Sequence, residues 1–456
     1  MLYDIMYLFA NNLRIIINYH IFVSNNYDML ISFAVTNFRS IRERIELNML
    51  KTGLKGLNAN FFKAANKKQL LKSAVVYGPN ASGKSAFLMG IKALEFMVLE
   101  SSGLKPDESI APYEPHRLER KYAERPVRFE ISFLVDKLQY DYRVSFTAKR
   151  IEMEELYYYP NSARTLLYSR SAGKDMKFGD YYKGARKTLE KLLLPNQLFL
   201  SKAAENNVDA LLEAYRFFTK GLSVYPIMGD FHENNLARLY AKKLAEDKDS
   251  IFSKRFNALI CALDTGITSV AVEEVDWKNY NFPGNMPEDI KKKFQEDYKY
   301  DIRTRHPVFD GDKAVDSAFF DIYDESAGTK SLFAIGGVII ETLEKGGVLV
   351  VDEFEKSLHP SITKFLIRLF HNELVNQKNA QLLFATHDIT QLSNDSFRRD
   401  QVWFVEKNDF GATSLQRCSD ILGIRLNTPL DKWYESGRFG ATPIINDVDF
   451  LIEMQQ

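Results

Sequence analysis

The sequence predicts an α/β protein built on a buried parallel sheet, and three segments carry this prediction. Residues 72–77 form a short, largely apolar run that leads through a glycine-containing turn into an apolar helical pattern over 86–97. A second apolar run, 348–351, ends in two adjacent acids, and a third, 381–385, ends in Thr-His-Asp. Strands that are covered on both faces show continuous rather than alternating apolar residues, as in a parallel sheet.

The turn after the first run reads Gly78-Pro-Asn-Ala-Ser-Gly-Lys-Ser85 and satisfies the pattern G-x-x-x-x-G-K-[ST]. Between a strand and a helix, this pattern forms a phosphate-binding loop whose backbone N–H groups point at phosphate oxygens. Lys84 is expected to reach the β- and γ-phosphates of ATP, and Ser85 to offer its hydroxyl to Mg²⁺. A glycine turn that binds nothing is the weaker interpretation. The expected nucleotide-binding residues of this loop are Gly78, Pro79, Asn80, Ala81, Ser82, Gly83, Lys84 and Ser85.

The two acids after the second run are Asp352 and Glu353. Both would emerge at the carboxyl end of a strand, which is where ligands collect in open α/β sheets. Asp352 is expected to lie on the Mg²⁺ side, and Glu353 to orient and deprotonate the attacking water. An Asp-Glu pair after a strand is common by itself, but together with the phosphate loop it indicates ATP hydrolysis.

Composition narrows the remaining classes of function. The chain has 456 residues, enough for two or three domains, and its 60 basic and 60 acidic residues balance. Net charge therefore gives no argument for binding DNA, RNA or an anionic membrane, although a local patch remains possible. Only Cys261 and Cys418 occur, so neither a disulfide framework nor a zinc site is indicated, and a cytoplasmic location is expected.

The sequence patterns predict a division of the chain into four regions. Residues 1–28 are apolar but interrupted by polar residues, so they predict an N-terminal extension, from an upstream start or as an interaction helix, and no membrane span. An N-terminal lobe is expected over 29–160, with a hairpin of strands around 136–139. A mixed, mainly helical insertion is expected over 161–314, in which 286–305 is a solvated helix or mobile loop, or else a nucleic-acid or partner surface. The C-terminal lobe would span 315–456.

The stretch before the second motif, Glu325-Ser-Ala-Gly-Thr-Lys-Ser331, resembles the signature loop of ATP-binding-cassette (ABC) ATPases. Ser326, Gly328 and Thr329 would form a helix N-terminus with free N–H groups, which is an anion site. The resemblance implies that this loop closes over the ATP of a partner subunit, so that two chains enclose two nucleotides. An ordinary Ser-capped helix is the alternative.

Two further positions follow the same order along the chain. The segment after Glu353 resembles the dimer-contacting loop of ABC ATPases, with Ser357 at its centre. His387 resembles the switch histidine that senses the γ-phosphate. The resemblance also implies a glutamine that contacts Mg²⁺, for which Gln139 and Gln197 are available and neither is preferred.

Together with Asn37-Phe-Arg-Ser40, these motifs resemble bacterial ABC-type ATPases of the AAA-15/AAA-21 group, and two tail segments, 398–407 and 434–441, are similar to the RloA/AbiLii subgroup. The resemblance covers residue 29 to about residue 446 and implies a P-loop NTPase of the ABC class with an antiparallel β subdomain and a large α-rich insertion. It implies a core similar to RecF and SMC ATPases, nucleotide contact by Arg39, and homodimerisation. It further implies a role in abortive infection beside a separately encoded, nuclease-like RloB partner.

Three alternatives remain open at this stage. A self-contained nuclease would need a second metal site, for which Asp447-Val-Asp449 and Glu406 offer only a short pattern. A RecF/SMC-like ATPase that clamps or repairs DNA is compatible with the motifs, although the missing heptads exclude a long coiled-coil arm. A scaffold without ATPase activity is disfavoured, because the expected carboxylates and phosphate ligands are present.

Overall fold

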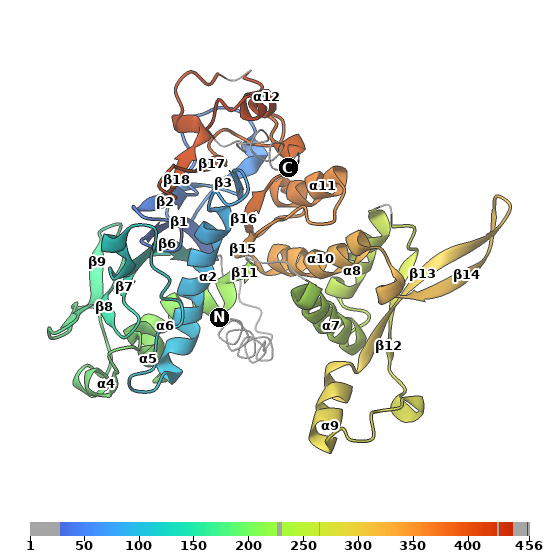
Figure 1. Cartoon of the computed structure of the whole chain (residues 1–456), viewed down its shortest axis with the longest axis horizontal. Helices are drawn as coiled ribbons and strands as arrows, with labels where there is room; N and C mark the ends of the chain where they lie inside the picture. Colours follow the sequence, from blue (N-terminus) through green and yellow to red (C-terminus); the bar gives the residue numbers. More distant parts are fainter. Residues whose placement is uncertain (1–27, 226–229, 264, 426–427, 441–453, 455–456) are drawn as a thin grey trace.

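The computed structural model describes residues 28–225, 230–263, 265–425, 428–440 and 454. Within these ranges the chain forms two large sheets and a projecting three-stranded sheet (Figure 1). The expected N-terminal extension, apart from Asp28, lies outside the described residues, as does the Asp447–Asp449 pattern.

The first large sheet is antiparallel and has seven strands in the order β10-β9-β8-β7-β6-β1-β2. It contains the predicted hairpin, whose strands pair from Val127–Phe146 to Val135–Leu138. The expected boundary at residue 160 falls inside this sheet, because β9 pairs with β8 and β10 pairs with β9. The strands are β1 Asp28–Thr36, β2 Ile45–Asn48, β6 Val127–Val135, β7 Leu138–Phe146, β8 Ile151–Tyr158, β9 Thr165–Ser171 and β10 Lys177–Phe178.

The second large sheet has six strands in the order β11-β15-β16-β5-β17-β18 and is parallel except for β18. Every residue of β5, β15 and β16 is buried, which explains why their sequences are continuously apolar. The predicted α/β class is therefore confirmed. The strands are β5 Ser73–Tyr77, β11 Leu222–Tyr225, β15 Val348–Val351, β16 Gln381–Thr386, β17 Val402–Lys407 and β18 Thr413–Arg417.

Helix α2 (Lys84–Glu100) lies between the two large sheets. Its Phe87 contacts Phe33 of β1 with ring centroids 5.5 Å apart, in a core that also contains Ala74 and Val76 of β5. The alternate residues of β5, Val75 and Tyr77, belong to a second core on the opposite face. Helices α10 (Ala327–Lys345) and α11 (Pro360–His371) cover that face, so the phosphate-loop strand is enclosed on both sides.

The region between the two nucleotide motifs contains both helices and strands. Residues 288–297 form the solvated helix favoured by the sequence, but the loop interpretation fails from residue 300, where β13 begins. The expected boundary at 314 falls inside β14. The elements are α4 Lys187–Leu192, α5 Phe199–Glu205, α6 Asp209–Arg216, α7 Asp230–Glu246, α8 Ile251–Ala262, β12 Ser269–Glu274, α9 Glu288–Asp297, β13 Tyr300–Asp310 and β14 Lys313–Asp321.

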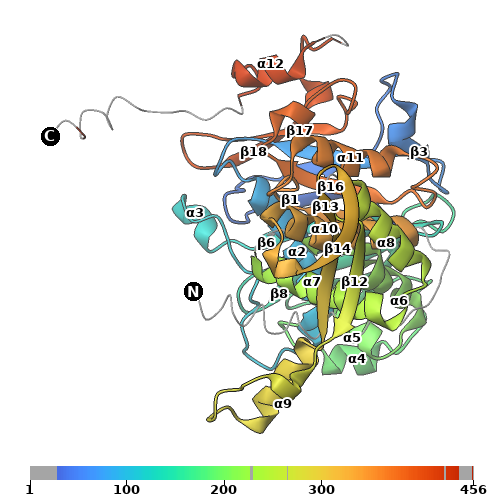
Figure 2. The same cartoon turned by 90° about the vertical axis from the view of Figure 1, so that its right-hand side faces the viewer.

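The three-stranded sheet, in the order β12-β13-β14, stands away from the two large sheets (Figure 1). Figures 1 and 2 both place α9 at the opposite end of the molecule from α12. Within the described ranges, none of the helices combines the length and apolar character needed to cross a membrane. The remaining elements are β3 Phe61–Lys63, β4 Gln69–Leu71, α3 Arg120–Ala123 and α12 Leu430–Glu435.

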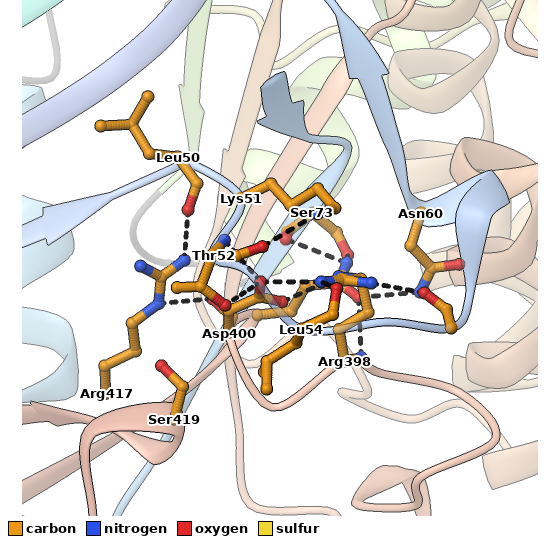
Figure 3. Close-up of polar contacts among 12 residues, drawn as sticks. Leu50, Lys51, Thr52, Leu54, Asn60, Ser73, Arg398, Asp400, Arg417 and Ser419 are labelled. Atoms are coloured by element: carbon orange, nitrogen blue, oxygen red, sulfur yellow. Dashed lines mark hydrogen bonds and ion pairs between the residues drawn. The ribbon is translucent and has the colours of Figure 1, made fainter. Parts of the chain in front are cut away.

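A buried polar network, which we call the β17 anchor, ties the loop over 50–56 to the start of β17 (Figure 3). Arg398 binds the Asp400 carboxylate at 2.9 Å and donates to the carbonyls of Leu54 and Gly56. The second oxygen of Asp400 accepts from the backbone N–H of Thr52 at 2.8 Å. The segment whose sequence resembles the RloA tail thus joins the N-terminal and C-terminal parts of the fold.

Candidate nucleotide-binding site

The ends of three parallel strands bring the predicted site residues to one edge of the sheet. Strand β16 lies between β5 and β15, with Thr386 opposite Tyr77 and Phe384 opposite Val351. The residues that follow these strands are Gly78, Asp352 and His387, which therefore emerge side by side. This edge is where an open parallel sheet binds ligands.

The phosphate loop requires glycine at both glycine positions of its sequence pattern. Gly83 has a φ of 112°, a conformation that other residues rarely adopt. A Cβ on Gly78 would lie 2.5 Å from the Val405 carbonyl oxygen. Thr413 of β18 also holds the loop, because its hydroxyl donates a hydrogen bond to the Ser82 carbonyl at 2.8 Å. The close approach of the backbone at Gly78 and the hydrogen bond from Thr413 thus both fix the shape of the loop.

Lys84 is buried at the first turn of α2 and bonds within its own loop. Its Nζ donates to the carbonyls of Gly78 at 2.8 Å and Pro79 at 3.1 Å, and lies 3.3 Å from His387 Nδ1. Burial lowers the pKa of Lys84 to about 8, although Asp352 opposes this change. The lysine predicted to bind phosphate is thus already in contact with the predicted switch histidine.

Asp352 and Ser85 form a set of oxygen atoms that fits Mg²⁺. Asp352 is buried and hydrogen-bonds the Ser85 side chain, and burial raises its pKa despite that bond. One carboxylate and one hydroxyl, completed by phosphate oxygens and water, match the way Mg²⁺ is usually held. The described residues contain no cluster of three or more His, Cys, Asp or Glu side chains that could bind a metal without a nucleotide.

Glu353 follows Asp352 and is exposed at the same edge, with a φ of 48° that is unusual for a residue other than glycine. Backbone strain of this kind concentrates at functional sites. His387 is also exposed, and its pKa is lowered by partial burial and by the neighbouring Lys84. The structure therefore brings together Lys84, Asp352, Glu353 and His387.

Glu355 was not identified from the sequence, yet it joins two of these loops. Its Oε1 accepts the backbone N–H of His387 at 2.6 Å, across 32 residues of sequence. Its Oε2 is buried without a hydrogen-bond partner among the described residues. An acid two residues after Glu353 is a signal that sequence reading could have used, but its partner is visible only in the fold.

The predicted signature loop forms the N-terminus of α10. Ser326 caps the helix, since its hydroxyl accepts from the Thr329 N–H at 3.1 Å. Gly328 lies against the predicted dimer loop, where a Cβ would be 2.7 Å from the Ser357 carbonyl oxygen. Figure 1 shows α10 extending from β15 toward the three-stranded sheet, so that its N-terminus lies away from α2.

Arg39 and the candidate glutamines have other partners. The Arg39 guanidinium binds Glu114 with two bonds of 2.7 and 3.2 Å, although its loop adjoins the phosphate loop through Thr413.

Gln197 donates to the carbonyls of Ser102 and Leu104, just beyond the C-terminus of α2. That end lies about 25 Å from the phosphate loop, from the rise of a 17-residue helix. Gln139 accepts from Lys68 at 2.7 Å on the seven-stranded sheet.

The sheet order and this site define the P-loop nucleoside triphosphatase fold of the ABC type, in which β16, the strand that His387 follows, lies between the strand of the phosphate loop and the strand of the acidic pair. The sequence model of the family AAA_21, described as "AAA domain, putative AbiEii toxin, Type IV TA system", matches residues 73–393. That span is more than half of the chain, and the chain belongs to this family. The resemblance to AAA-21 ATPases is thereby confirmed.

Other comparisons give the following results. No curated protein matches the chain. Among solved structures, the SMC head domain from Thermotoga maritima aligns with 12% identity and a TM-score of 0.37, covering 85% of this chain and 98% of that chain. An SMC head domain with a coiled coil and joint from Pyrococcus yayanosii aligns with 13% identity and a TM-score of 0.40, covering 91% of this chain and 100% of that chain.

Proposed function

We propose that this protein is an ATP-hydrolysing switch that dimerises around two ATP molecules and controls a separate effector in anti-phage defence. The observation that carries the proposal is the meeting of Lys84, Asp352, Glu353 and His387 at one sheet edge. A phosphate ligand, a metal carboxylate, a base and a γ-phosphate sensor are the groups that ATP hydrolysis needs.

Each side chain has a separate role in this proposal. Lys84 would leave the carbonyls of its own loop and bind the β- and γ-phosphates, while Ser85 and Asp352 hold Mg²⁺, which when bound neutralises phosphate charge. Glu353 is exposed at the same edge, so its carboxylate can reach a water molecule there. It orients this water and accepts its proton. His387 donates to the γ-phosphate from its position beside Lys84.

Dimerisation is supported by the position of the signature helix. The N-terminus of α10 presents free N–H groups and the Ser326 cap, which suit a phosphate. These groups lie away from α2 of their own chain, so a second copy is the source of nucleotide that fits them. Since ATP would then bridge two chains, occupancy and dimer closure are linked.

The decisive experiment uses two variants of the full chain with Mg²⁺ and ATP. Glu353→Gln is expected to lower phosphate release at least a hundredfold and to trap a dimer in sedimentation velocity, because a neutral amide cannot accept the proton. Lys84→Ala is expected to abolish nucleotide binding and to remain monomeric. Hydrolysis by Glu353→Gln at the parent rate would refute the catalytic assignment.

The defence role is proposed from family membership and needs a cellular test. The printed description of the family, "putative AbiEii toxin, Type IV TA system", suits a cytoplasmic ATPase that releases a separately encoded, RloB-like nuclease effector. Direct contact with DNA or RNA is not supported by the balanced net charge. Cells carrying the gene and its neighbours should survive or limit phage infection, and Lys84→Ala should remove that protection. Equal plaque counts with and without Lys84 would contradict the role.

A further inference from the structure

The projecting ribbon of β13 and β14 exposes an unusual number of large apolar side chains. Between residues 308 and 323, six such side chains are at least 38% exposed, among them Phe309 at 60% and Phe319 at 56%. β14 is also an edge strand, since β13 is its only neighbour in the three-stranded sheet. Because successive strand residues face opposite sides, Phe309 and Phe319 share one face of the ribbon, and Val308 and Phe320 share the other. Exposed apolar side chains of this kind on an edge ribbon mark an interaction site. The six residues are Val308, Phe309, Val315, Phe319, Phe320 and Tyr323.

The base of the ribbon is fixed to the signature loop. Glu325, the residue before Ser326, accepts hydrogen bonds from Thr304 and from His306 Nε2, both on β13. Phe320 lies opposite Thr304 in the strand pair, so the exposed phenylalanines begin beside the signature loop. The ribbon then extends about 20 Å further to its tip, at the usual rise per strand residue. A partner of the signature loop would therefore also meet the ribbon.

A second apolar surface flanks the phosphate loop of the same chain. Leu118 is 71% exposed and Phe410 is 76% exposed, and a Cβ on Gly411 would lie 2.2 Å from the Leu118 side chain. Thr413 connects this surface to the phosphate loop through its bond to the Ser82 carbonyl. We call residues 117–125 together with Phe410 the P-loop flank.

The charges of the two surfaces are opposite. The ribbon tip carries Asp310, Asp312 and Asp316 against a single Lys313, all exposed. In the P-loop flank, Glu119 is already bound by Arg42 at 3.0 Å and Lys121 at 2.7 Å. The other exposed charged residues of the flank are Arg117, Arg120, Glu124 and Arg125, so the flank is basic.

We propose that in the ATP-bound dimer the ribbon of each copy docks on the P-loop flank of the second copy. The proposal rests on the proposed function, because it takes the ATP-bridged dimer as given. The signature loop must approach the partner's phosphate loop, and the two surfaces adjoin these two elements on opposite sides of the contact. Apolar residues meet apolar residues there, and acids meet bases. The ribbon therefore contributes to closure and to the choice of an identical partner.

The first test removes the apolar contact from a chain that cannot hydrolyse ATP. With Glu353→Gln as the parent, Phe309→Ser with Phe319→Ser should raise the dimer dissociation constant at least about tenfold in sedimentation velocity with Mg²⁺ and ATP. A matched control is Leu374→Ser, because Leu374 is 84% exposed at a different place, just after α11, and should leave the constant unchanged. Binding of a fluorescent ATP analogue by the monomers should be equal in all three chains.

The second test reverses charges and identifies the docking partner. Asp310→Lys with Asp312→Lys should weaken the dimer, and so should Arg117→Glu with Arg120→Glu in another chain. Mixing these two reversed chains should restore dimers, because each ribbon then faces a flank of opposite charge. A mixture that dimerises no better than its components refutes the contact.

The outcomes separate this contact from the proposed function. A parent chain that remains monomeric with ATP contradicts both. A parent dimer whose dissociation constant does not respond to the ribbon variants contradicts the ribbon contact alone.

Discussion

At the scale of single residues, Glu355 connects the loop of the acidic pair to the loop of His387. Its 2.6 Å bond to the His387 N–H involves a carboxylate, and such bonds are stronger than neutral ones. Glu355→Ala should lower kcat for ATP hydrolysis about tenfold with little change in KM, because the loss of a charged hydrogen bond misplaces His387 without removing a phosphate ligand. Steady-state phosphate release measures both constants.

A conservative variant separates position from charge at this residue. Glu355→Gln keeps an oxygen that accepts the His387 N–H, so most of the lost rate should return. If Glu355→Ala turns over at the parent rate, or if it changes KM alone, the coupling is refuted.

Motif residues could be predicted because their roles depend on local sequence. Asp352 directly follows the buried strand β15, and Lys84 lies in the loop and helix that follow the buried strand β5. Because both strands belong to one parallel sheet, the sequence implies that the two residues lie at the same edge of that sheet. The partners of Glu355 and Arg39 could not be predicted, because His387 and Glu114 reach them only through the tertiary fold. The strain at Glu353 is invisible to a sequence pattern for the same reason.

At the scale of elements, His371 links α11 to the phosphate-loop strand. Its Nε2 lies 2.8 Å from the Ser73 hydroxyl, which also accepts a hydrogen bond from the Gln401 amide. Burial lowers the pKa of His371 to about 3. The unfolded imidazole takes a proton below about pH 6.5, whereas the folded one does not until about pH 3, so acidification favours unfolding.

The prediction is a loss of stability in mild acid. Between pH 6.5 and 5 the parent should lose unfolding free energy relative to His371→Gln, with a slope that approaches about 1.4 kcal/mol per pH unit at the lower end of this range. Denaturant titrations of both chains at pH 7.5, 6.5 and 5.5 measure the difference. Parallel pH dependences of the two chains would show that His371 does not cause the effect.

The β17 anchor makes a separate prediction for the same sheet. Asp400→Ala would leave Arg398, which is only 2% exposed, without its carboxylate, and should lower the unfolding free energy by about 3–5 kcal/mol. Glu205→Ala, which removes the half-exposed pair with Lys202, serves as a control and should change it by less than about 1 kcal/mol. Similar denaturation midpoints for both variants would contradict a structural role of the anchor.

At the scale of the whole molecule, the kinds of sheet could be predicted better than the limits of the domains. The apolar runs indicated the parallel sheet, and alternation indicated the hairpin of β6 and β7. Strands β9, β13 and β14 were missed because they are mostly exposed or half-buried, so they lack the apolar signal that marks a core strand. The domain limits at 160 and 314 therefore fell inside sheets.

The placement of β5 between β16 and β17 has a consequence for synthesis of the chain. The neighbours of this strand begin about 300 residues after it, and Thr413, which supports the phosphate loop, comes later still. At about 5–20 residues per second, a ribosome needs roughly 16 to 65 seconds to make the intervening chain. Nascent protein therefore exposes an unfinished nucleotide site during that interval, and the proposed site is assembled only after β16, β17 and Thr413 have been made.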